Sequence, residues 1–406
     1  MNAKLKRIFS NIGHLSAIKL LTMGLPLFVY PVIISTIGKE SFGEILLFQT
    51  VVGFLLLFIS YGFNLSAVKT LSEVDQYSAI VRVFSSVFWS KALIALLVSF
   101  IAYALNFYIP SDISKFFCLA FFYILGELFL CQYFFHGRSI VKQFTYLVFV
   151  VRLVFFFIML YALDSDVTSF YVAAIFSIEY FAMGLLSFFV AVYFSNINIR
   201  VVSLRDILLS IKEGGAVFLV VFVTALKDKF NLVIVAIFFT TSMIVVVDFS
   251  IKILTLLAIP SSIISMAAYP TNSRLKSKKL LYGVILSGLL VTCVAYALFV
   301  LTLDFFNLKY FNFNDKSIDL IYLVVASVFF LCISSIVATN GLIAQGHNSS
   351  MLNNVIINTS FYFVSLGLVY LFTDFRSVDS FLSVIVLTYA FEAVTRIYMA
   401  RKLKVI

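Results

Sequence analysis

Charged residues are scarce in this chain. Only 12% of its 406 residues are Asp, Glu, Lys or Arg, whereas soluble domains carry about 25%. Hydrophobic residues make up 63% of the sequence. The composition therefore predicts a polytopic, all-α membrane protein. In a soluble protein, the net charge of +10 would suggest a nucleic-acid partner. In a membrane protein, the distribution of basic residues between loops is what carries information, so we expect no nucleic-acid partner.

Residues that hold metals or carry catalysis are also few. The cysteines lie singly in apolar runs, and neither they nor the histidines have metal-ligand spacing. No phosphate-binding glycine loop is present. We therefore expect no metal, no cofactor and no enzymatic activity, and we expect any driving energy to come from gradients or mass action. The residues concerned are Cys118, Cys131, Cys293, Cys332, His14, His136 and His347.

Apolar runs long enough to cross a bilayer recur along the chain, since about 20 apolar residues span the hydrocarbon core. They predict twelve helices, six on each side of a polar linker. The predicted organisation is an N-terminal six-helix bundle (1–195), a cytoplasmic linker (196–213) and a C-terminal six-helix bundle (214–406). The predicted spans are 12–36, 42–63, 86–109, 114–135, 143–163, 168–194, 214–239, 243–268, 280–303, 320–342, 351–372 and 378–400.

Basic residues are concentrated in alternate loops. Lys and Arg gather at 4–7, 69–82, 138–142, 200–212, 274–279 and 401–404, which are the two tails and the loops on their side. The opposite loops hold few basic residues and several aspartates. Because basic loops stay in the cytoplasm, both termini are predicted to be cytoplasmic, in a bacterial inner membrane. All loops are short, which indicates that the protein acts within the bilayer.

The predicted span 214–239 carries three charges at its centre, namely Lys227, Asp228 and Lys229. A charge at that depth costs about 3 kcal/mol on insertion scales, so such groups normally face a protein interior or a wet cavity. Successive residues on a helix step by about 100°, so the two lysines lie on nearly opposite sides. The alternative is a loop between two short helices, but neither half is long enough to span alone.

The two halves of the chain echo each other. Gly137 and Gly346 both end an apolar helix ahead of polar residues, at an offset of 209, and Glu44 matches Asp248 at an offset of 204. The two similar offsets predict a parallel duplication, as in transporters whose substrate lies at the repeat interface.

The stretch IISTIGKESFGEILLFQ (Ile33–Gln49) carries a family pattern: a glycine, an acidic residue two positions on, an aromatic–glycine pair and an apolar helix. The glycine exits, the proline–basic segment Tyr269–Lys279 and the charged span 214–239 follow in order. The whole chain resembles the Wzx O-antigen flippases of the multidrug/oligosaccharidyl-lipid/polysaccharide exporter superfamily. It departs from the pattern at Glu44, where the family often has tyrosine.

This resemblance implies two six-helix bundles around a central cavity that opens alternately to either face. It implies a substrate of oligosaccharide on undecaprenyl pyrophosphate, moved from the cytoplasmic to the periplasmic leaflet. Membrane lipids, a polysaccharide polymerase and the chain-length machinery of surface polysaccharide or lipopolysaccharide synthesis are candidate partners. Proton or sodium coupling is left open, as are the sugars of the substrate.

The polar residues at predicted membrane depth have two interpretations. In the first, Arg152, Lys227 and Lys229 make a cationic cavity for pyrophosphate, lined also by Glu127, Glu179 and Asp228. In the second, Arg152 and the lysines form structural ion pairs with Glu127, Glu179 or Asp228. Asp248, Lys252 and Glu44 are candidates for coupling or gating. Asp248–Lys252 and Glu392–Arg396 are predicted to be intrahelical pairs, since their members are four residues apart. Lys19 and Lys91 are expected to extend their side chains to water.

Two other functions remain open. A cation-coupled multidrug exporter of the same superfamily would need an acidic cavity, whereas Arg152, Lys227 and Lys229 supply cations. A membrane-embedded polysaccharide polymerase would need a large outer loop with arginines, and the outer loops here are short.

The predicted topology can be tested with reporter fusions. Fusions after residues 75, 205, 276 and 404 are expected to report cytoplasm, and fusions after 112, 165, 312 and 376 periplasm, because basic loops are retained inside. Alkaline phosphatase and green fluorescent protein activities measure the two locations. One reproducible inversion would contradict the twelve-helix arrangement.

Overall fold

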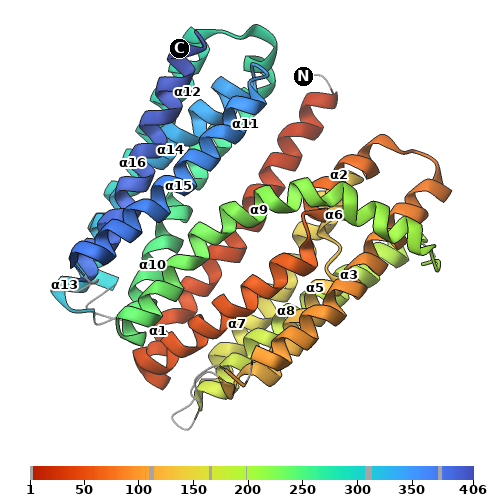
Figure 1. The fold of residues 1–406 in the computed structure, drawn as a ribbon, viewed down its shortest axis with the longest axis horizontal. Coiled ribbons are helices and arrows are strands. Elements are labelled where there is room, and N and C mark those ends of the chain that lie inside the picture. The colour runs from red at the N-terminus through yellow and green to blue at the C-terminus, as the bar shows by residue number, and fades with distance from the viewer. Residues whose placement is uncertain are drawn as a thin grey trace. The chain divides into compact units, whose positions relative to one another are not determined.

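The computed structural model describes residues 3–105, 107–108, 114–163, 167–197, 199–306, 313–373 and 377–406, and its regular structure in these ranges is helical (Figure 1). The fusion positions 112, 165, 312 and 376 lie outside the described residues. Helices alone satisfy backbone hydrogen bonds within a single segment, which a chain crossing lipid requires.

The described chain forms two compact units. Residues 28–244 make one, here called the N-terminal unit, and residues 1–27 with 245–406 make the other, the C-terminal unit. This division differs from the predicted bundles 1–195 and 214–406. The predicted linker is also largely helical: α9 (Leu204–Phe238) begins inside it, where the Ser203 side chain accepts a hydrogen bond from the Asp206 backbone N–H. We assigned a linker because these residues are polar, but residues 204–213 form the beginning of α9.

The N-terminal unit contains most of the second part of α1 and the helices up to α9, and α9 packs against α2 and α3. The predicted span 114–135 is broken into α5 and α6. The elements of this unit are α1 (Ala3–Ser60), α2 (Phe63–Glu73), α3 (Tyr77–Leu105), α5 (Phe117–Phe129), α6 (Gln132–Gly137), α7 (Val141–Ala162), α8 (Ser169–Ser195) and α9.

Helix α1 contains the first two predicted spans joined end to end. Gly38 divides it, with φ 81° and ψ 163°, a conformation that favours glycine because no Cβ is present. Ten helices among the described residues are long and apolar enough to cross a membrane, or eleven if Leu204–Gly215 and Val217–Phe238, bent by 45°, form one span. The prediction of twelve counts the two parts of α1 separately. The chain is a multi-pass membrane protein.

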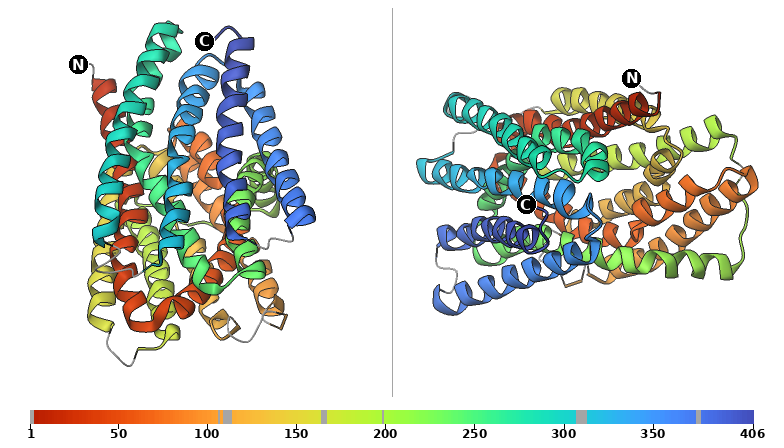
Figure 2. Two further views of the ribbon diagram at one scale, coloured as in Figure 1. Left: turned by 90° about the vertical axis from the view of Figure 1, so that its left-hand side faces the viewer. Right: turned by 90° about the horizontal axis from the view of Figure 1, so that it is seen from above.

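In the C-terminal unit, α12, α14 and α16 run side by side, and α15 packs on α16 (Figure 2). Both chain ends lie at the same end of this unit (Figures 1 and 2). The predicted span 243–268 divides before Pro260, which stands in the first turn of α11. The elements are α10 (Thr241–Leu257), α11 (Ile259–Leu275), α12 (Lys278–Phe306), α13 (Asp315–Ala326), α14 (Val328–Ile336), the π-helix η2 (Val337–Ile343), α15 (Asn348–Thr373) and α16 (Val378–Lys402).

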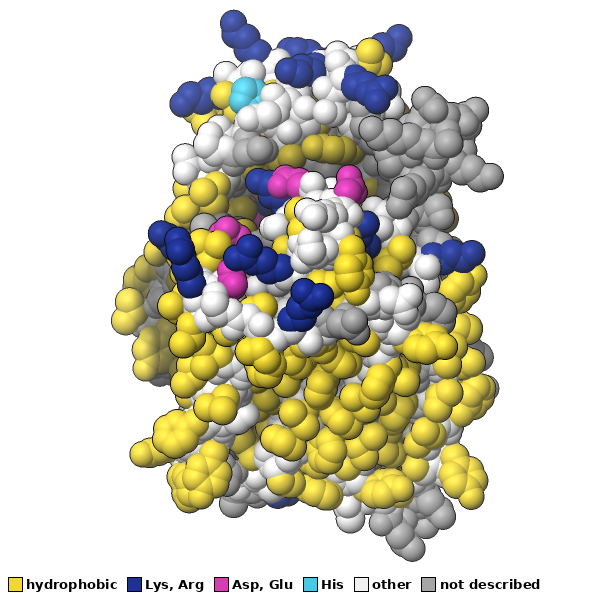
Figure 3. All heavy atoms as spheres, turned by 90° about the vertical axis from the view of Figure 1, so that its right-hand side faces the viewer, with side chains coloured by type: hydrophobic (Ala, Val, Ile, Leu, Met, Phe, Trp, Pro, Cys, Tyr) yellow, Lys and Arg dark blue, Asp and Glu magenta, His cyan; other side chains and the backbone are white. Residues whose placement is uncertain are grey.

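A broad hydrophobic surface covers the lower part of the face drawn in Figure 3, and charged side chains gather above it. Large apolar side chains are turned outward in many helices, among them Leu96 at 69%, Phe100 at 73% and Leu301 at 76% exposure. A soluble monomer rarely exposes so large an apolar patch. Lipid is the solvent that fits this surface.

Helices α5 and α8 of the N-terminal unit pack backbone to backbone. A Cβ added to Gly184 would lie 2.0 Å from the Gly126 carbonyl oxygen, and one added to Gly126 would lie 2.8 Å from the Tyr180 carbonyl oxygen. Small residues allow membrane helices to approach backbone to backbone. The contact holds Glu127 and Tyr180 at a fixed separation, which positions the polar groups described below.

We predict that Gly184→Ala destabilises the protein by about 3 kcal/mol, because the obstructing atom is backbone and α5 and α8 must separate. Thermal unfolding of the purified protein in detergent measures the change. Gly367→Ala in α15 is the matched control, since nothing lies within 4 Å of its added Cβ. Equal unfolding midpoints for the two variants would contradict the packing.

Candidate functional site

A buried ion pair lies at the centre of the N-terminal unit. The Lys91 ammonium on α3 is 3.3 Å from a carboxylate oxygen of Glu127 on α5, and the two side chains are 3% and 6% exposed. The Tyr180 hydroxyl on α8 donates to the other Glu127 oxygen at 2.6 Å. Three helices are thus joined by one carboxylate.

Lys91 also stabilises the break between α5 and α6. Its ammonium donates to the Leu130 carbonyl oxygen at 3.0 Å, a group that the broken helix leaves without an intrahelical partner. The Cys131 backbone N–H donates to Ser187 Oγ at 3.1 Å. The expectation that Lys91 extends to water was therefore wrong, because the broken helix supplies a buried acceptor that the sequence did not reveal. The side chain of Lys19 lies outside the described part of the chain.

A second pair joins α7 and α8. An Arg152 guanidinium nitrogen lies 2.7 Å from Glu179 Oε1, with side-chain exposures of 20% and 9%. Arg152 Nε is buried and makes no hydrogen bond to another described residue. Of the acidic partners that the sequence offered to Arg152, the structure selects Glu179, whereas Glu127 belongs to Lys91.

The two pairs reach adjacent residues of α8, since Glu179 binds Arg152 and Tyr180 donates to Glu127. The ring centroid of Tyr123 is 5.2 Å from that of Tyr180. Gln49 on α1 donates to the Tyr123 hydroxyl at 3.2 Å. We call the two ion pairs with Tyr123 and Tyr180 the Lys91–Arg152 network. Its two cations and two carboxylates balance, so it adds no net charge.

The three charged residues of α9 lie within a helix, as predicted, and not in a loop. A Cβ added to Gly53 on α1 would lie 2.2 Å from Lys229 Nζ, and the same Nζ is 6.0 Å from the centroid of the Phe54 ring. Lys229 therefore contacts α1. Lys227 lies about 200° round the helix from Lys229 and is turned away from that contact, while Asp228 is exposed.

The predicted coupling or gating residues are all paired with lysines. Asp248 and Lys252 are 2.6 Å apart on α10 of the C-terminal unit, one helical turn from each other, as the sequence predicted. Glu44 on α1 lies 2.9 Å from Lys115 in the N-terminal unit. The pairs show the same chemistry at matching places in the two halves, and their part in coupling stays a prediction.

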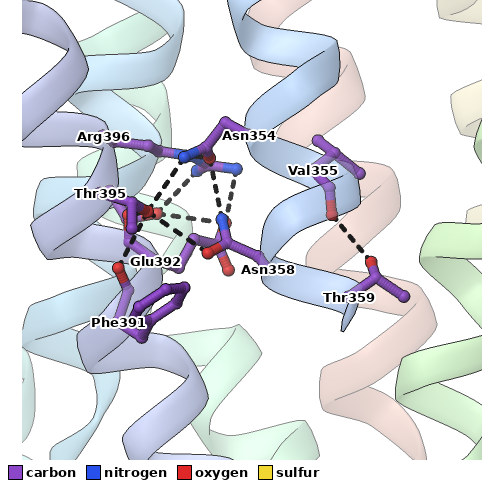
Figure 4. A network of polar contacts seen from close by, with 9 residues as sticks. Asn354, Val355, Asn358, Thr359, Phe391, Glu392, Thr395 and Arg396 are labelled. Carbon is purple, nitrogen blue, oxygen red and sulfur yellow. Dashed lines mark hydrogen bonds and ion pairs between the residues drawn. The ribbon is translucent and has the colours of Figure 1, made fainter. Parts of the chain in front are cut away.

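The C-terminal unit has its own buried polar network (Figure 4). Arg396 and Glu392 on α16 are 2.5 Å apart, Arg396 Nε donates to Asn354 Oδ1 at 3.0 Å, and an Arg396 terminal nitrogen donates to Ser334 Oγ at 2.6 Å. Asn358 donates to Asn354 at 2.8 Å. Sequence reasoning found the pair but missed its partners on α14 and α15. The signal available was the spacing of Asn354 and Asn358, one turn apart in an apolar helix.

The comparisons with known proteins agree with this architecture. No family model matches the chain. A curated protein of Escherichia coli (strain K12) named "Putative O-antigen transporter" is 24% identical over 111 residues, a match that spans 27% of each chain.

Solved structures with the same fold include proteins described as transporters. A MATE family multidrug transporter of the MOP superfamily in an inward-facing conformation aligns with a TM-score of 0.68 at 12% identity, over 95% of this chain and 94% of that one. A MOP superfamily transporter from Pyrococcus furiosus, described as having a binding pocket of reverse polarity, aligns with a TM-score of 0.60 at 12% identity, over 100% of this chain and 98% of that one. The resemblance seen in the sequence is confirmed at the level of the fold.

We predict that Lys91→Met lowers the amount of folded protein, because it strands the buried Glu127 carboxylate at a cost of about 3–5 kcal/mol. Adding Glu127→Gln should restore much of the loss. Fluorescence-detected size-exclusion chromatography measures both. Lys316→Met is the control, since the Lys316–Asp379 pair is exposed and 3.8 Å apart, and such pairs contribute about 0–1 kcal/mol. Failure of the second substitution to rescue would contradict the pairing.

Proposed function

We propose that this chain, which has the fold of the MATE transporters of the MOP superfamily, is a flippase for undecaprenyl-pyrophosphate-linked oligosaccharide. It moves this lipid by alternating access from the cytoplasmic to the periplasmic leaflet of a bacterial inner membrane, with both termini in the cytoplasm. The O-antigen or a similar surface-polysaccharide repeat unit is the substrate class. The local match to an O-antigen transporter of E. coli supports this choice among the functions of the fold.

One observation carries the proposal, namely the charge on α9. The network from Lys91 to Arg152 is neutral, and so are the pairs Asp248–Lys252 and Glu392–Arg396. Residues 227–229 add two cations and one anion near the middle of the membrane-crossing part of α9 (Val217–Phe238). Charged groups at that depth normally face a protein interior or a wet cavity, and they often mark substrate paths. A pyrophosphate is an anion of the matching sign.

The two lysines have different roles in this proposal. Lys229 contacts Gly53 and Phe54 on α1, which fits a structural role in holding α9 against that helix. Lys227 projects from the other side and attracts the pyrophosphate as a compact, mobile point charge. Arg152, Glu127 and Glu179 form the neutral polar interior of the same unit. We propose that they contact the glycan as paired, neutral groups and not as free charges.

The charge balance disfavours a cation-coupled drug exporter. Such an exporter requires carboxylates available to a cationic drug or a coupling ion, whereas Glu127 and Glu179 are each committed to a basic side chain. Asp248 and Glu44, the remaining coupling candidates, also face lysines. Coupling to protons or sodium would have to open one of these pairs. The polymerase and chain-length proteins that use the product on the periplasmic side are the proposed functional partners.

The proposed activity is tested by deleting the gene in its native host. Undecaprenyl-linked oligosaccharide should then accumulate in the cytoplasmic leaflet, and mass spectrometry of the extracted lipid identifies its sugars. Purified protein in liposomes should move the extracted lipid between leaflets, measured by its accessibility to an added glycosidase. Normal leaflet distribution after deletion, with no flipping in liposomes, would overturn the proposal.

We predict opposite phenotypes for the two α9 lysines. Lys227→Ala should abolish flipping at normal protein abundance, and Lys227→Arg should retain much of it, because the charge is kept. Lys229→Ala should lower abundance, because it removes the contact of this side chain with Gly53 and Phe54 on α1. Flipping per folded molecule in liposomes separates the two effects.

Gly53→Ala provides a variant that keeps every charge. The new methyl group must displace the Lys229 ammonium, which is the end of a flexible side chain and can move cheaply. Flipping should therefore survive if Lys227 serves the substrate. If instead Gly53→Ala abolishes flipping and Lys227→Ala does not, the roles are reversed. Normal flipping by both alanine variants would remove α9 from the substrate path.

A further inference from the structure

A pocket of about 250 Å³ lies within the N-terminal unit, between α2, α3 and the beginning of α9. Its polar lining includes Ser86 and Arg82 on α3 and Asp206, Ser210 and Glu213 on α9. It belongs to neither the Lys91–Arg152 network nor the charged centre of α9. Basic loops assign this end of the unit to the cytoplasm, where a flippase first meets its substrate.

The polar groups of the pocket are open to a ligand. Ser86 is 7% exposed and lines the cavity, while Ser210 is half-buried and Glu213 is exposed. Hydroxyl and carboxylate groups in these positions can form hydrogen bonds with a polar ligand that enters the cavity.

The rest of the lining is apolar and lies beside these groups. Ala67, Val83, Val87 and Leu209 contribute aliphatic surface to the same cavity. A pyranose ring combines an aliphatic C–H face with a rim of hydroxyl groups, and it matches a wall of this mixed kind. The carboxylate accepts hydrogen bonds from sugar hydroxyls, and the serine hydroxyls both donate and accept them.

The charged residues of the lining favour a neutral or cationic ligand over an anionic one. Arg82 is paired with Asp206, with nitrogen and oxygen 2.5 Å apart, so Glu213 gives the lining residues themselves a net negative charge. We propose that this pocket binds one neutral or amino sugar unit, separately from the pyrophosphate. The source of that sugar, a lipid-linked glycan, rests on the proposed function, whereas the binding itself does not.

The walls of the pocket are held in place by contacts between α3 and the segment that leads into α9. The Trp89 indole N–H donates to the Arg200 carbonyl oxygen at 3.1 Å, and the Arg200 backbone N–H donates to Ser85 Oγ at 3.1 Å. The Tyr77 hydroxyl donates to the Asn196 carbonyl oxygen. These contacts come from α3 residues on either side of Arg82 and next to Ser86, so the site is preformed.

Trp89 gives a direct test, because it is the sole tryptophan of the sequence and lies one helical turn from Ser86. Intrinsic fluorescence of the full-length protein in detergent is titrated with methyl α-D-glucoside, N-acetylglucosamine and glucosamine up to 100 mM. At least one of them should give a saturable change with a Kd on the order of 1–10 mM, as expected for so small a ligand. Glucuronate and inorganic phosphate should bind at least tenfold more weakly.

Two variants show whether the change comes from the pocket. Ser210→Leu fills it from the half-buried side of α9 and should abolish saturation, and Ser72→Leu, an equal change at an exposed position outside the lining, should leave it intact. Saturation-transfer difference NMR with the same sugars detects binding that leaves the fluorescence unchanged. Ser86→Leu repeats the test from α3, with its unfolding midpoint measured alongside.

The proposal is overturned if no sugar binds by either method, if phosphate or glucuronate binds more tightly than the neutral sugars, or if Ser210→Leu binds normally. None of these measurements depends on flipping. Sugar binding by a protein that fails to flip the lipid would leave the pocket assigned and refute only the proposed function. Flipping without sugar binding would refute the pocket alone.

Discussion

The cost of a charge in hydrocarbon governs this structure. In water an ion pair contributes little, but inside a membrane bundle an unpaired charge costs several kcal/mol. Among the described residues, buried charges are compensated by partners of opposite sign: Lys91 by Glu127, Arg152 by Glu179 and Arg396 by Glu392. The first two pairs each join two helices. The third lies within α16 and is joined to α14 and α15 by hydrogen bonds to Ser334 and Asn354. Residues 227–229 place two cations and one anion near the middle of the membrane-crossing part of α9, and charged groups at that depth normally face a protein interior or a wet cavity.

The positions of the membrane-crossing helices were predictable, because the length of each apolar run can be read from the sequence. The helical state of Lys227–Lys229 followed from length alone, since neither half of 214–239 could span by itself. The partner of each buried charge was not predictable. Arg152 had three acidic candidates, and only the Gly126–Gly184 contact, which brings α5 against α8, decides how Glu127 and Glu179 are shared. The helical state of residues 204–213 was missed because a polar, partly exposed helix and a loop have similar compositions.

The duplication seen in the sequence gains support from backbone irregularities. Applying the offset of 209 to the break at Cys131 leads to Asn340, which lies in the π-helix η2. Both halves therefore depart from regular α-helix at equivalent places, six residues before Gly137 in the first half and six residues before Gly346 in the second. In each, polar side chains satisfy the freed backbone: Lys91 and Ser187 in one, and Asn272, which donates to the Asn340 carbonyl oxygen, in the other. Irregular backbone at membrane depth is tolerated only where protein groups complete its hydrogen bonds.

A lipid-linked glycan presents two chemically opposed parts, an anionic pyrophosphate and a sugar chain rich in hydroxyl groups. A single cationic cavity would hold the first and gain little from the second. The N-terminal unit separates suitable groups along one helix: α9 begins beside a net negative, hydroxyl-lined pocket and carries its surplus positive charge some fifteen residues further on, about 22 Å at 1.5 Å per residue. In the proposed function, a headgroup is recognised by its sugar at one level and by its charge at another. The bend of 45° between Leu204–Gly215 and Val217–Phe238 lies between these levels, so a change in that angle would alter the spacing of the two sites without breaking either.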